Sequence, residues 1–513
     1  MIVDAETDEA RAAIAGRRFD LAICGAGPAG ITLALEMAAA GYDVALLEGG
    51  GLDYLDHSQE LYQGENGGLD YFDLDFVRVR QFGGSTNHWG GWVRALDSED
   101  FDKRSEVPHS GWPFGKAALD PYAEKAASIL EAPGSEELGN PAQPLGHNFA
   151  GLNSVRFQIT DAVRFADKYV EEVRASRQIM LVLHCNVLDM ILHEGLGSVR
   201  HVVCASYDRP DRFSVEARFF TLAMGGLENP RFLLNATSQL AAGIGNGKDL
   251  VGRYFAEHPD VWAGFYLVRP DLPAYTGPSF LVPDGPWTAA HRTLRYCLAV
   301  AGHKEEESWS LATIRARLEQ WACGSDLALS ILHMLRSDMK AGQVLCTDDL
   351  EEIEGLPGAG QLRIFTEQAP NPQSRLTLAQ SLDRFGQRRA RLEWNLTDLD
   401  YHTMRTAVRG FGEELAAADL GRVRMADWLR ADNPVLPSVR TDRVAHHHHI
   451  GTTRMAGDPQ SGVVDANARV FGIANLHIAG SSIFPTGGYA NPTFTIIQLT
   501  LRLADHLKIE LAR

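Results

Sequence analysis

Short apolar runs, polar turns and one helical stretch open the chain. Residues 19–24 (FDLAIC) form an apolar run of strand length, residues 31–40 have a strongly helical composition, and residues 44–48 (VALLE) predict a second buried strand. Runs of about four to eight apolar residues are consistent with buried strands, and longer ones with helices. The order strand, helix, strand within about thirty residues predicts the start of a parallel, doubly wound sheet.

The turn between the first strand and the helix carries the sequence GAGPAG, residues 25–30. In this pattern Gly25 allows a tight turn, Gly27 lets the backbone approach a pyrophosphate, and Gly30 allows close contact between helix and strand. The free N–H groups at the helix start attract phosphate. Glu48 ends the second strand, where a carboxylate accepts hydrogen bonds from ribose hydroxyls. The segment predicts a dinucleotide site and leaves NAD and FAD as alternatives.

Further apolar runs continue the pattern towards the C-terminus. Residues 179–183, 462–465 (GVVD) and 475–482 (NLHIAGSS) predict strands, the last leading into a turn. An apolar helix to about Leu507 follows Asn491-Pro492. Asparagine is a favoured N-cap and proline a favoured first helical residue, which predicts that Asn491 caps this helix.

Composition and charge restrict the function classes. A chain of 513 residues favours two domains, and 45% hydrophobic with 22% charged residues is typical of a globular protein. The net charge of −18 argues against nucleic-acid and anionic-membrane partners and leaves a cationic substrate open. The acidic N-terminus has no apolar signal core, and prolines and paired glycines interrupt the uncharged stretch 477–501. We therefore expect a cytoplasmic protein without a membrane span.

A second glycine-rich segment, residues 78–92 (RVRQFGGSTNHWGGW), combines glycines, small polar residues and aromatic residues. Such a loop can lay its backbone against a flat ring system, where larger side chains would interfere. A merely flexible surface turn has no need of His88 and two tryptophans. The six cysteines are scattered without CxxC spacing, which favours buried thiols over disulfides or a metal cluster.

Together these segments resemble the glucose–methanol–choline (GMC) family of flavoprotein oxidoreductases, and within it the branch of pyranose 2-oxidase and bacterial sugar and glycoside oxidases. The resemblance rests on separated motifs in the family's order. They are GAGPAG with Glu48, GGSTNHWGG, AMGGLENPR (223–231), Gly252-Arg253, Glu257-His258-Pro259, Glu367-Gln368, the HxxGTxRM segment and the closing NPT helix. The resemblance implies FAD as the nucleotide and an α/β fold, with a Rossmann-like FAD-binding domain and a discontinuous substrate-binding domain built on a β-sheet with helices.

The implied domains alternate along the chain. The FAD-binding domain would comprise residues 1–105 with the flavin loop 78–92, residues 180–260, and the catalytic C-terminal part 441–513. The substrate domain would comprise residues 106–179 and 261–440. This second domain holds five tryptophans that suit either sugar stacking or the core: Trp112, Trp262, Trp287, Trp309 and Trp321.

The resemblance also implies which residues bind FAD: Gly25, Gly27, Pro28, Ala29, Gly30, Glu48, Gly49, Arg80, Gly83, Gly84, Ser85, Asn87, His88, Trp89, Gly90, Val187, Gly480, Ser481 and Thr493. Val187 matches the adenine-contacting position. His88 aligns with a point of covalent flavin attachment, but Thr86-Asn87 before it and Gly90-Gly91 after it depart from that pattern. A covalent bond and a hydrogen-bonded histidine near the ring are therefore both open.

The stretch AHHHHIGTTRM, residues 445–455, places four histidines side by side. In the family's HxxGT pattern the leading histidine is the catalytic base, which selects His448 here. A neutral imidazole with a pKa near ~6.5 is suited to accept a hydroxyl proton while the adjacent C–H hydrogen leaves as hydride. Asn491 corresponds to the family's second active-site residue, whose amide would orient the substrate hydroxyl. Capping its helix is the competing role.

Adjacent residues of an extended strand point to alternate faces, so four consecutive imidazoles cannot ligate one ion, and no metal site is expected. The same alternation predicts that His446 and His448 face the cofactor and that His447 and His449 make structural hydrogen bonds.

We therefore expect an FAD-dependent oxidoreductase acting on a CH–OH group of a sugar or sugar-like polyol. The acidic charge admits an amino sugar, such as an aminoglycoside intermediate, beside a neutral sugar or glycoside. Without a CxxCH haem site or an iron–sulfur cysteine array, electrons would pass to oxygen or an external acceptor. Two rival hypotheses are a non-redox lyase or photochemical enzyme of the same fold, and a binding protein like the GDP-dissociation inhibitors. The oligomeric state has no recognisable signal in the sequence.

Overall fold

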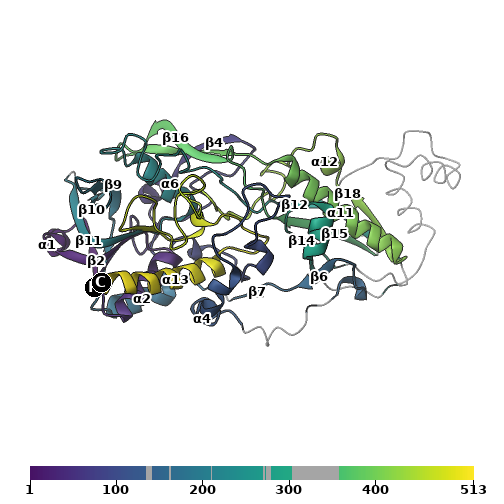
Figure 1. Ribbon diagram of the computed structural model, residues 1–513, viewed down its shortest axis with the longest axis horizontal. Coiled ribbons are helices and arrows are strands. Elements are labelled where there is room, and N and C mark those ends of the chain that lie inside the picture. Colours follow the sequence, from purple (N-terminus) through teal and green to yellow (C-terminus); the bar gives the residue numbers. More distant parts are fainter. Residues whose placement is uncertain are drawn as a thin grey trace.

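The computed structural model describes residues 1–133, 141, 143–160, 163–209, 211–269, 272, 279–302 and 358–513. Its largest sheet has eight strands in the order β1-β8-β3-β2-β11-β10-β9, with β19 alongside β11. Most neighbours in this sheet are parallel, whereas β9, β10 and β11 form an antiparallel end. Helices α2 and α13 lie side by side along it (Figure 1). This arrangement confirms the predicted α/β fold.

The strands of this sheet are β1 (Ile2–Asp4), β2 (Arg18–Cys24), β3 (Val44–Leu47), β8 (Ile179–Leu183), β9 (Asn186–Leu192), β10 (Val199–Ala205), β11 (Phe213–Leu222) and β19 (Leu476–Ile478). The helices of the described chain are α1 (Asp8–Ile14), α2 (Pro28–Ala39), α3 (Asp56–Gln59), α4 (Ala123–Leu130), α5 (Phe165–Ala175), α6 (Gly225–Asn235), α7 (Gly285–His291), α11 (Asp398–Ala417), α12 (Asp427–Arg430) and α13 (Thr493–Leu511). Short 3₁₀ turns are η1 (Glu60–Tyr62), η2 (Gly84–Asn87), η3 (Ser98–Asp100), η4 (Lys116–Ala118), η5 (Asp120–Tyr122), η6 (Pro144–Gly146) and η7 (Ser481–Ile483).

A second sheet of six strands lies at the other end of the molecule, with α11 packed against it (Figure 1). Its order is β18-β12-β15-β14-β13-β6. These strands are β6 (Leu152–Val155), β12 (Asp260–Val268), β13 (Ser279–Pro283), β14 (Tyr296–Val300), β15 (Ala359–Thr366) and β18 (Gly421–Met425). All neighbours in this sheet are antiparallel, which allows one face to carry the helix while the other faces the rest of the molecule.

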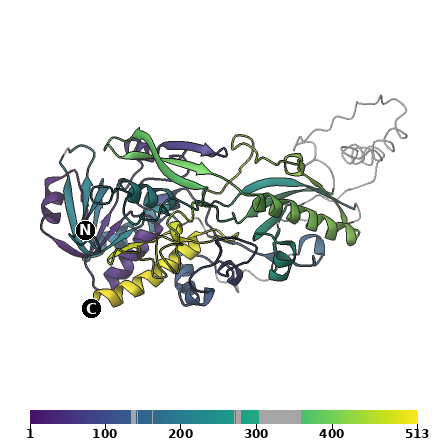
Figure 2. The same ribbon diagram turned by 45° about the horizontal axis from the view of Figure 1, so that its top comes forward.

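A third, three-stranded sheet connects distant parts of the chain. Its strands are β4 (Gly64–Gly68), β16 (Arg375–Leu382) and β17 (Arg388–Trp394), and it runs along the top of the molecule in Figure 2. Trp394 pairs with Gly68 at one end of the ladder. The segment that follows β4 is thereby brought over the region between the two larger sheets. A two-stranded pair of β5 (Trp92–Val93) and β7 (Gln158–Ile159) completes the ladders.

Most of the predicted elements are confirmed. The strands predicted at 19–24, 44–48 and 179–183 form, the second of them ending one residue earlier at Leu47. The predicted helix 31–40 begins three residues earlier at Pro28, and 475–482 contains β19 followed by η7. The strand predicted at 462–465 is wrong. Val464 makes only isolated bridges, and the Asp465 side chain accepts the backbone N–H groups of Asn467 and Arg469, which turns the chain there.

The tryptophans of the described chain favour the core alternative. Trp112 is buried and donates its Nε1–H to Thr486, Trp262 packs against Phe265, and Trp287 packs against the core beside α11. Trp309 and Trp321 lie outside the described residues. Among the described helices, none is long and apolar enough to cross a bilayer.

Gly30 is the fold position with the least space for a side chain. A Cβ atom there would lie 1.9 Å from the carbonyl oxygen of Gly25, which is backbone and cannot rotate away. We predict that Gly30→Ala lowers the free energy of unfolding by about 1–3 kcal/mol, measured by urea denaturation. Gly247→Ala is the matched control because nothing lies within 4 Å of its added Cβ. Equal stability of the two variants would contradict the close approach of helix and loop.

Candidate active site

The turn between β2 and α2 has the geometry of a phosphate-binding loop. Gly25 adopts a φ of 103°, and an added Cβ would lie 2.7 Å from the carbonyl oxygen of Ala223. At Gly27 the nearest heavy atom to an added Cβ is 4.0 Å away, so its surroundings are open. No side chain caps the start of α2. The first-turn N–H groups and the partial positive charge of the helix are therefore available to an anion.

Glu48 ties this loop to the end of β3. The carboxylate is 6% exposed and accepts the backbone N–H of Ala26 through Oε2 at 2.9 Å and that of Gly50 through Oε1 at 2.8 Å. Each carboxylate oxygen can accept a second hydrogen bond. Glu48 can thus hold the loop in shape and still accept hydroxyl groups of a ribose.

The glycine-rich segment 78–92 is held rigidly against the phosphate loop. Gly83 and Gly84 adopt left-handed conformations, and an added Cβ at Gly84 would lie 3.0 Å from the Cα of Gly27. Arg164 donates to the carbonyl oxygens of Thr86 and Trp89 at 2.9 and 2.7 Å. These contacts hold the backbone between residues 84 and 90 in place, where it forms one wall of the cavity described next.

One cavity of about 1250 Å³ joins the phosphate loop to the histidine segment. It exceeds the ~300–1,000 Å³ of ordinary small-molecule pockets, which leaves room for a dinucleotide and a substrate together. Both predicted catalytic residues, His448 and Asn491, line this cavity. The predicted cofactor residues that line it are Gly25, Gly27, Pro28, Ala29, Glu48, Gly49, Arg80, Gly84, Ser85, His88, Trp89, Gly90, Val187, Gly480, Ser481 and Thr493.

Three predicted cofactor residues are not part of the cavity lining. Gly30 lies beneath the carbonyl group of Gly25, and an added Cβ at Gly83 would lie 2.7 Å from the backbone nitrogen of Ala166. Asn87 donates to the carbonyl oxygen of Phe82 at 2.9 Å. These residues shape the loops behind the lining.

The four histidines do not form a regular strand. His447 adopts a φ of 61°, and only Ala445 and Ile450, which flank the run, make bridges to the segment around Glu257. The predicted alternation of faces is therefore wrong, because a left-handed residue in the middle of the run redirects the chain. All four imidazoles line the cavity.

His448 is paired with a histidine from another segment. Its Nδ1 lies 2.8 Å from Nδ1 of His258, so one of these nitrogens donates to the other. No side-chain contact in the described chain engages Nε2 of His448, which can therefore face the cavity as the free ring nitrogen. Burial and then the nearby His258 and His446 lower the pKa of His448 well below its ordinary value. The ring is neutral at physiological pH, and with its hydrogen on Nδ1 it presents a lone pair on Nε2.

His446 and Asn491 line the same cavity as His448. His446 Nε2 lies 2.7 Å from Oδ2 of Asp260, a fully buried carboxylate that also pairs with Arg363 and Arg443. The predicted N-cap at Asn491 is wrong, because α13 begins after Pro492, which occupies the capping position without a side-chain hydrogen bond. The amide of Asn491 is thereby free of the competing capping role.

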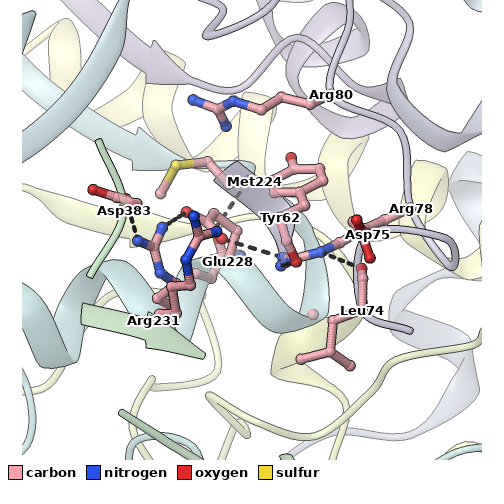
Figure 3. A network of polar contacts seen from close by, with 12 residues as sticks. Tyr62, Leu74, Asp75, Arg78, Arg80, Met224, Glu228, Arg231 and Asp383 are labelled. Carbon is pink, nitrogen blue, oxygen red and sulfur yellow. Dashed lines mark hydrogen bonds and ion pairs between the residues drawn. The ribbon is translucent and has the colours of Figure 1, made fainter. Parts of the chain in front are cut away.

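A buried charge network supports the cavity floor (Figure 3). Glu228 on α6 accepts from Arg78 at 3.1 Å and from Arg231 at 2.6 Å, and Arg231 also pairs with Asp383 at 2.5 Å. Above them, Arg80 donates to Asn186 at 2.6 Å, while its buried Nε has no hydrogen-bond partner in the described chain. Arg80 lines the cavity and offers an unused donor to a bound anion.

Sequence reasoning named Glu257 and His258 only as parts of a motif, and it missed Tyr71 and Asp260. The motif EHPD gave a signal, since it combines two carboxylates and a histidine within four residues. Tyr71 lies in the stretch LDYFDLDF, where nothing distinguishes it from a surface aromatic residue. The Tyr71 hydroxyl contacts Glu257 and His449, and these contacts depend on the pairing of β4 with β17, strands more than three hundred residues apart.

Parts of this chain match one protein family and several known proteins. Residues 370–500 match the family model described as GMC oxidoreductase. The fructose dehydrogenase large subunit of Gluconobacter japonicus is 25% identical over 309 residues, 59% of this chain and 50% of that protein. The choline oxidase of Arthrobacter globiformis is 28% identical over 125 residues, 22% of each chain. The chain thus matches half or less of the length of these curated relatives.

Solved structures support the fold. A pyridoxine 4-oxidase from Mesorbium loti superposes with a TM-score of 0.54 at 18% identity, covering 95% of this chain and 99% of that one. A formate oxidase gives a TM-score of 0.54 at 16% identity, covering 96% and 99%. GMC oxidoreductases bind FAD. The open backbone at Gly27, the uncapped start of α2 and the unused donor of Arg80 all fit such a dinucleotide.

Glu228 gives a stability prediction. Burial opposes its ionisation, but Arg231 and Arg78 outweigh burial and lower its pKa from 4.5 to about 2. A carboxylate with a lowered pKa stabilises the fold above its unfolded pKa, and this stabilisation is lost as pH falls through the folded pKa. We therefore expect stability to fall between the two values, from 4.5 towards 2.

We predict that Glu228→Gln costs about 3–5 kcal/mol of unfolding free energy at neutral pH, because Arg78 loses its buried counter-charge and Arg231 keeps only Asp383. The variant should also lose the part of the acid dependence that Glu228 supplies. Urea denaturation across pH measures both effects, with the exposed Glu194→Gln as control. A variant as stable as the control would show that the network does not hold the cavity floor.

Proposed function

We propose that the chain, whose residues 370–500 match the family model of the GMC oxidoreductases, is an FAD-dependent oxidoreductase acting on a CH–OH group of a sugar or sugar-like polyol. The observation that carries this proposal is the single cavity that runs from the phosphate loop to the neutral imidazole of His448. A nucleotide-binding protein without redox chemistry has no need of a base at the far end of its nucleotide site.

In this proposal FAD lies along the lining residues. The phosphate loop and the start of α2 hold the pyrophosphate, Glu48 binds ribose hydroxyls, and Val187 contacts the adenine. The backbone of residues 84–90, with Gly480, Ser481 and the start of α13 at Thr493, surrounds the flavin. Bound there, FAD would supply the acceptor for a hydride. The first sheet would then carry the cofactor, and the six-stranded sheet would bound the substrate.

His448 accepts the substrate hydroxyl proton at Nε2. Its Nδ1 hydrogen points to Nδ1 of His258, which fixes the tautomer and the plane of the ring. Burial, with the neighbouring His446, lowers the pKa of His258 to about 4, so the partner is neutral as well and accepts this hydrogen bond. Asn491 donates an amide hydrogen to the substrate oxygen and orients the hydroxyl towards His448.

His88 has a place in the same lining. His88 lines the cavity, where partial burial, then Arg164, lowers its pKa below the ordinary value. A neutral ring at this position is compatible with both roles set out for it, a bond to FAD or a hydrogen bond near the flavin.

The charges of the substrate side favour a neutral polyol over an amino sugar. Arg363, Arg440 and Arg443 line the cavity near His446. Two carboxylates, Asp260 and Asp442, pair with Arg363 and Arg443, which leaves one arginine cation in excess on this side. The whole chain has a net charge of −18, but this side of the cavity has no such excess of negative charge. Cationic walls raise the cost of placing an ammonium group beside them. Of the relatives, one is named for fructose, a neutral sugar, and another for choline, a cation.

A lyase or photochemical enzyme of the same fold and a GDP-dissociation-inhibitor-like binding protein are the rival proposals. The binding protein predicts a colourless purified protein. The lyase and the photochemical enzyme predict a yellow protein whose flavin colour does not bleach when an alcohol is added without oxygen.

We predict that the purified chain binds FAD and that anaerobic addition of its alcohol substrate bleaches the flavin absorbance. His448→Ala should slow this bleaching by about 10²- to 10⁴-fold, the usual contribution of a general base, while FAD stays bound. The exposed His193→Ala is the control for loss of a histidine. Undiminished bleaching in His448→Ala would assign the proton to another base, His446 being the nearest candidate.

A second prediction concerns the substrate charge. Neutral sugars should bleach the flavin at least about tenfold faster than matched amino sugars, a difference of ~1.4 kcal/mol. Arg440→Gln should narrow this gap, because it removes one cation from the cavity rim. Stopped-flow absorbance with the same panel measures both. Faster bleaching by the amino sugars would refute the neutral-substrate proposal and restore the amino-sugar hypothesis.

A further inference from the structure

A buried carboxyl group lies directly beneath the histidine segment and takes no part in the chemistry described above. Glu257 is 0% exposed. Its Oε2 accepts the backbone N–H groups of His258 at 3.0 Å and of His448 at 2.9 Å. Its Oε1 accepts the hydroxyl of Tyr71 at 2.5 Å. One side chain thus joins the segment after β4, the segment before β12 and the histidine run.

Tyr71 connects this carboxyl group to a second imidazole. Its hydroxyl oxygen lies 3.0 Å from Nε2 of His449. Since the hydroxyl hydrogen points to Glu257, the oxygen accepts the Nε2–H of His449. Trp394 and Phe255 pack edge-on against the Tyr71 ring, and within the described chain the hydroxyl group bonds to Glu257 and His449 alone. The result is an unbranched chain of hydrogen bonds from His449 through Tyr71 to Glu257.

The outer end of this chain reaches the cavity. His449 lines the cavity and is 8% exposed. Its second ring nitrogen, Nδ1, has no hydrogen-bond partner within the described chain. A proton in the cavity can therefore reach the ring at Nδ1 while the opposite nitrogen is already bonded to Tyr71.

We propose that His449, Tyr71 and Glu257 form a proton relay that stores one proton from the active-site cavity on the buried carboxyl group. The proposal deepens the function proposed above and rests on it. A proton arrives at Nδ1 of His449, the Nε2 hydrogen moves to the oxygen of Tyr71, and the Tyr71 hydroxyl hydrogen moves to Oε1 of Glu257. The imidazole ends as the Nδ1–H tautomer, the phenol is again neutral, and Glu257 gains the one proton.

The environment of each group suits its place in the relay. Burial, then His447 and Arg78, lower the pKa of His449 well below its ordinary value, and burial with Glu257 raises that of Tyr71 well above its own. His449 and Tyr71 are both uncharged at neutral pH, so each passes a proton on without keeping it. Burial raises the pKa of Glu257 to about 7, against the opposing hydrogen bonds from Tyr71 and from backbone N–H groups. The last group can therefore both take and release a proton near neutrality.

The relay gives the proton released by substrate oxidation a place to stay. His448 takes that proton first, but burial and its histidine neighbours make its protonated form strongly acidic. His258, its hydrogen-bond partner, has a pKa of about 4 for the same reasons, burial first and His446 second. Among these neighbours, Glu257 holds a proton best at neutral pH. Transfer from His448 across the cavity to Nδ1 of His449 completes the path.

The test follows the tautomer of His449 in the full-length protein. In histidine labelled with ¹⁵N, NMR distinguishes an Nε2–H ring from an Nδ1–H ring, and the signal of His449 is assigned by its loss in His449→Asn. As pH falls through about 7, we expect the wild-type His449 ring to change from Nε2–H to Nδ1–H. The infrared band of a protonated buried carboxyl group should appear over the same pH range and be absent in Glu257→Gln.

Two variants separate the relay from a structural role. Tyr71→Phe removes the hydroxyl that joins His449 to Glu257. The His449 tautomer should then no longer change over the pH range in which the infrared band of the carboxyl group appears. Tyr296→Phe is the matched control, because Tyr296 lies in the same core and its buried hydroxyl has no hydrogen-bond partner in the described chain. In Tyr296→Phe, the His449 tautomer and the infrared band of the carboxyl group should still change over the same pH range. A wild-type His449 tautomer that is constant with pH, or a coupled change that survives in Tyr71→Phe, would overturn the relay.

Different measurements test the proton relay and the proposed oxidoreductase function. The tautomer and the carboxyl band are measured without substrate, so they report on the relay even if no alcohol bleaches the flavin. If bleaching occurs, Glu257→Gln should remove the pH dependence near 7 from its rate, whereas His448→Ala should lower the rate at every pH. A rate with unchanged pH dependence in Glu257→Gln would also refute the relay.

Discussion

The carboxylate of Glu257 joins the two backbone segments that carry His258 and His448, and the geometry of the cavity floor depends on this junction. One oxygen accepts both backbone N–H groups, while the two imidazoles meet through their Nδ1 atoms at 2.8 Å. Buried backbone N–H groups must find acceptors, and here a single carboxyl oxygen satisfies two of them. Without it the segments would have no common anchor at this point, and the free Nε2 of His448 would lose its fixed direction.

The second constraint is the burial of many ionisable groups around one cavity. Burial lowers the pKa of each histidine in the cluster where a shift is resolved, His258, His447, His448 and His449. Four adjacent cations would repel one another strongly in a medium of low polarity, so these four rings are stable in the fold only when they are neutral. This neutrality is also what a base requires. The same physical condition thus permits the fold and prepares the proposed chemistry.

The sequence predicted the local parts of this site and missed the parts built by distant contacts. Gly25, Gly30 and Glu48 belong to a motif whose residues meet within one strand, one turn and one helix, so spacing alone determined their roles. The parity argument for the histidines failed because a left-handed residue, His447, interrupts the extended run. No spacing rule could supply Tyr71, since a strand pairing between β4 and β17 brings it under His449. Asn491 lost its predicted cap for a local reason, because the helix starts after proline instead of before it.

The network of Arg78, Glu228, Arg231 and Asp383 relates the cofactor end of the cavity to its catalytic end. Arg78 belongs to the glycine-rich segment, Glu228 and Arg231 to α6, and Asp383 to the turn after β16. Arg78 also lies over the ring of Tyr62 at 3.8 Å and is among the charges that lower the pKa of His449. A buried ion network costs desolvation, so its value lies in fixing positions more than in adding stability. Here it fixes the loop that would face the flavin relative to the helix beneath the histidines. In the proposed function, cofactor and base would therefore share one rigid support, as hydride and proton transfer from adjacent atoms requires.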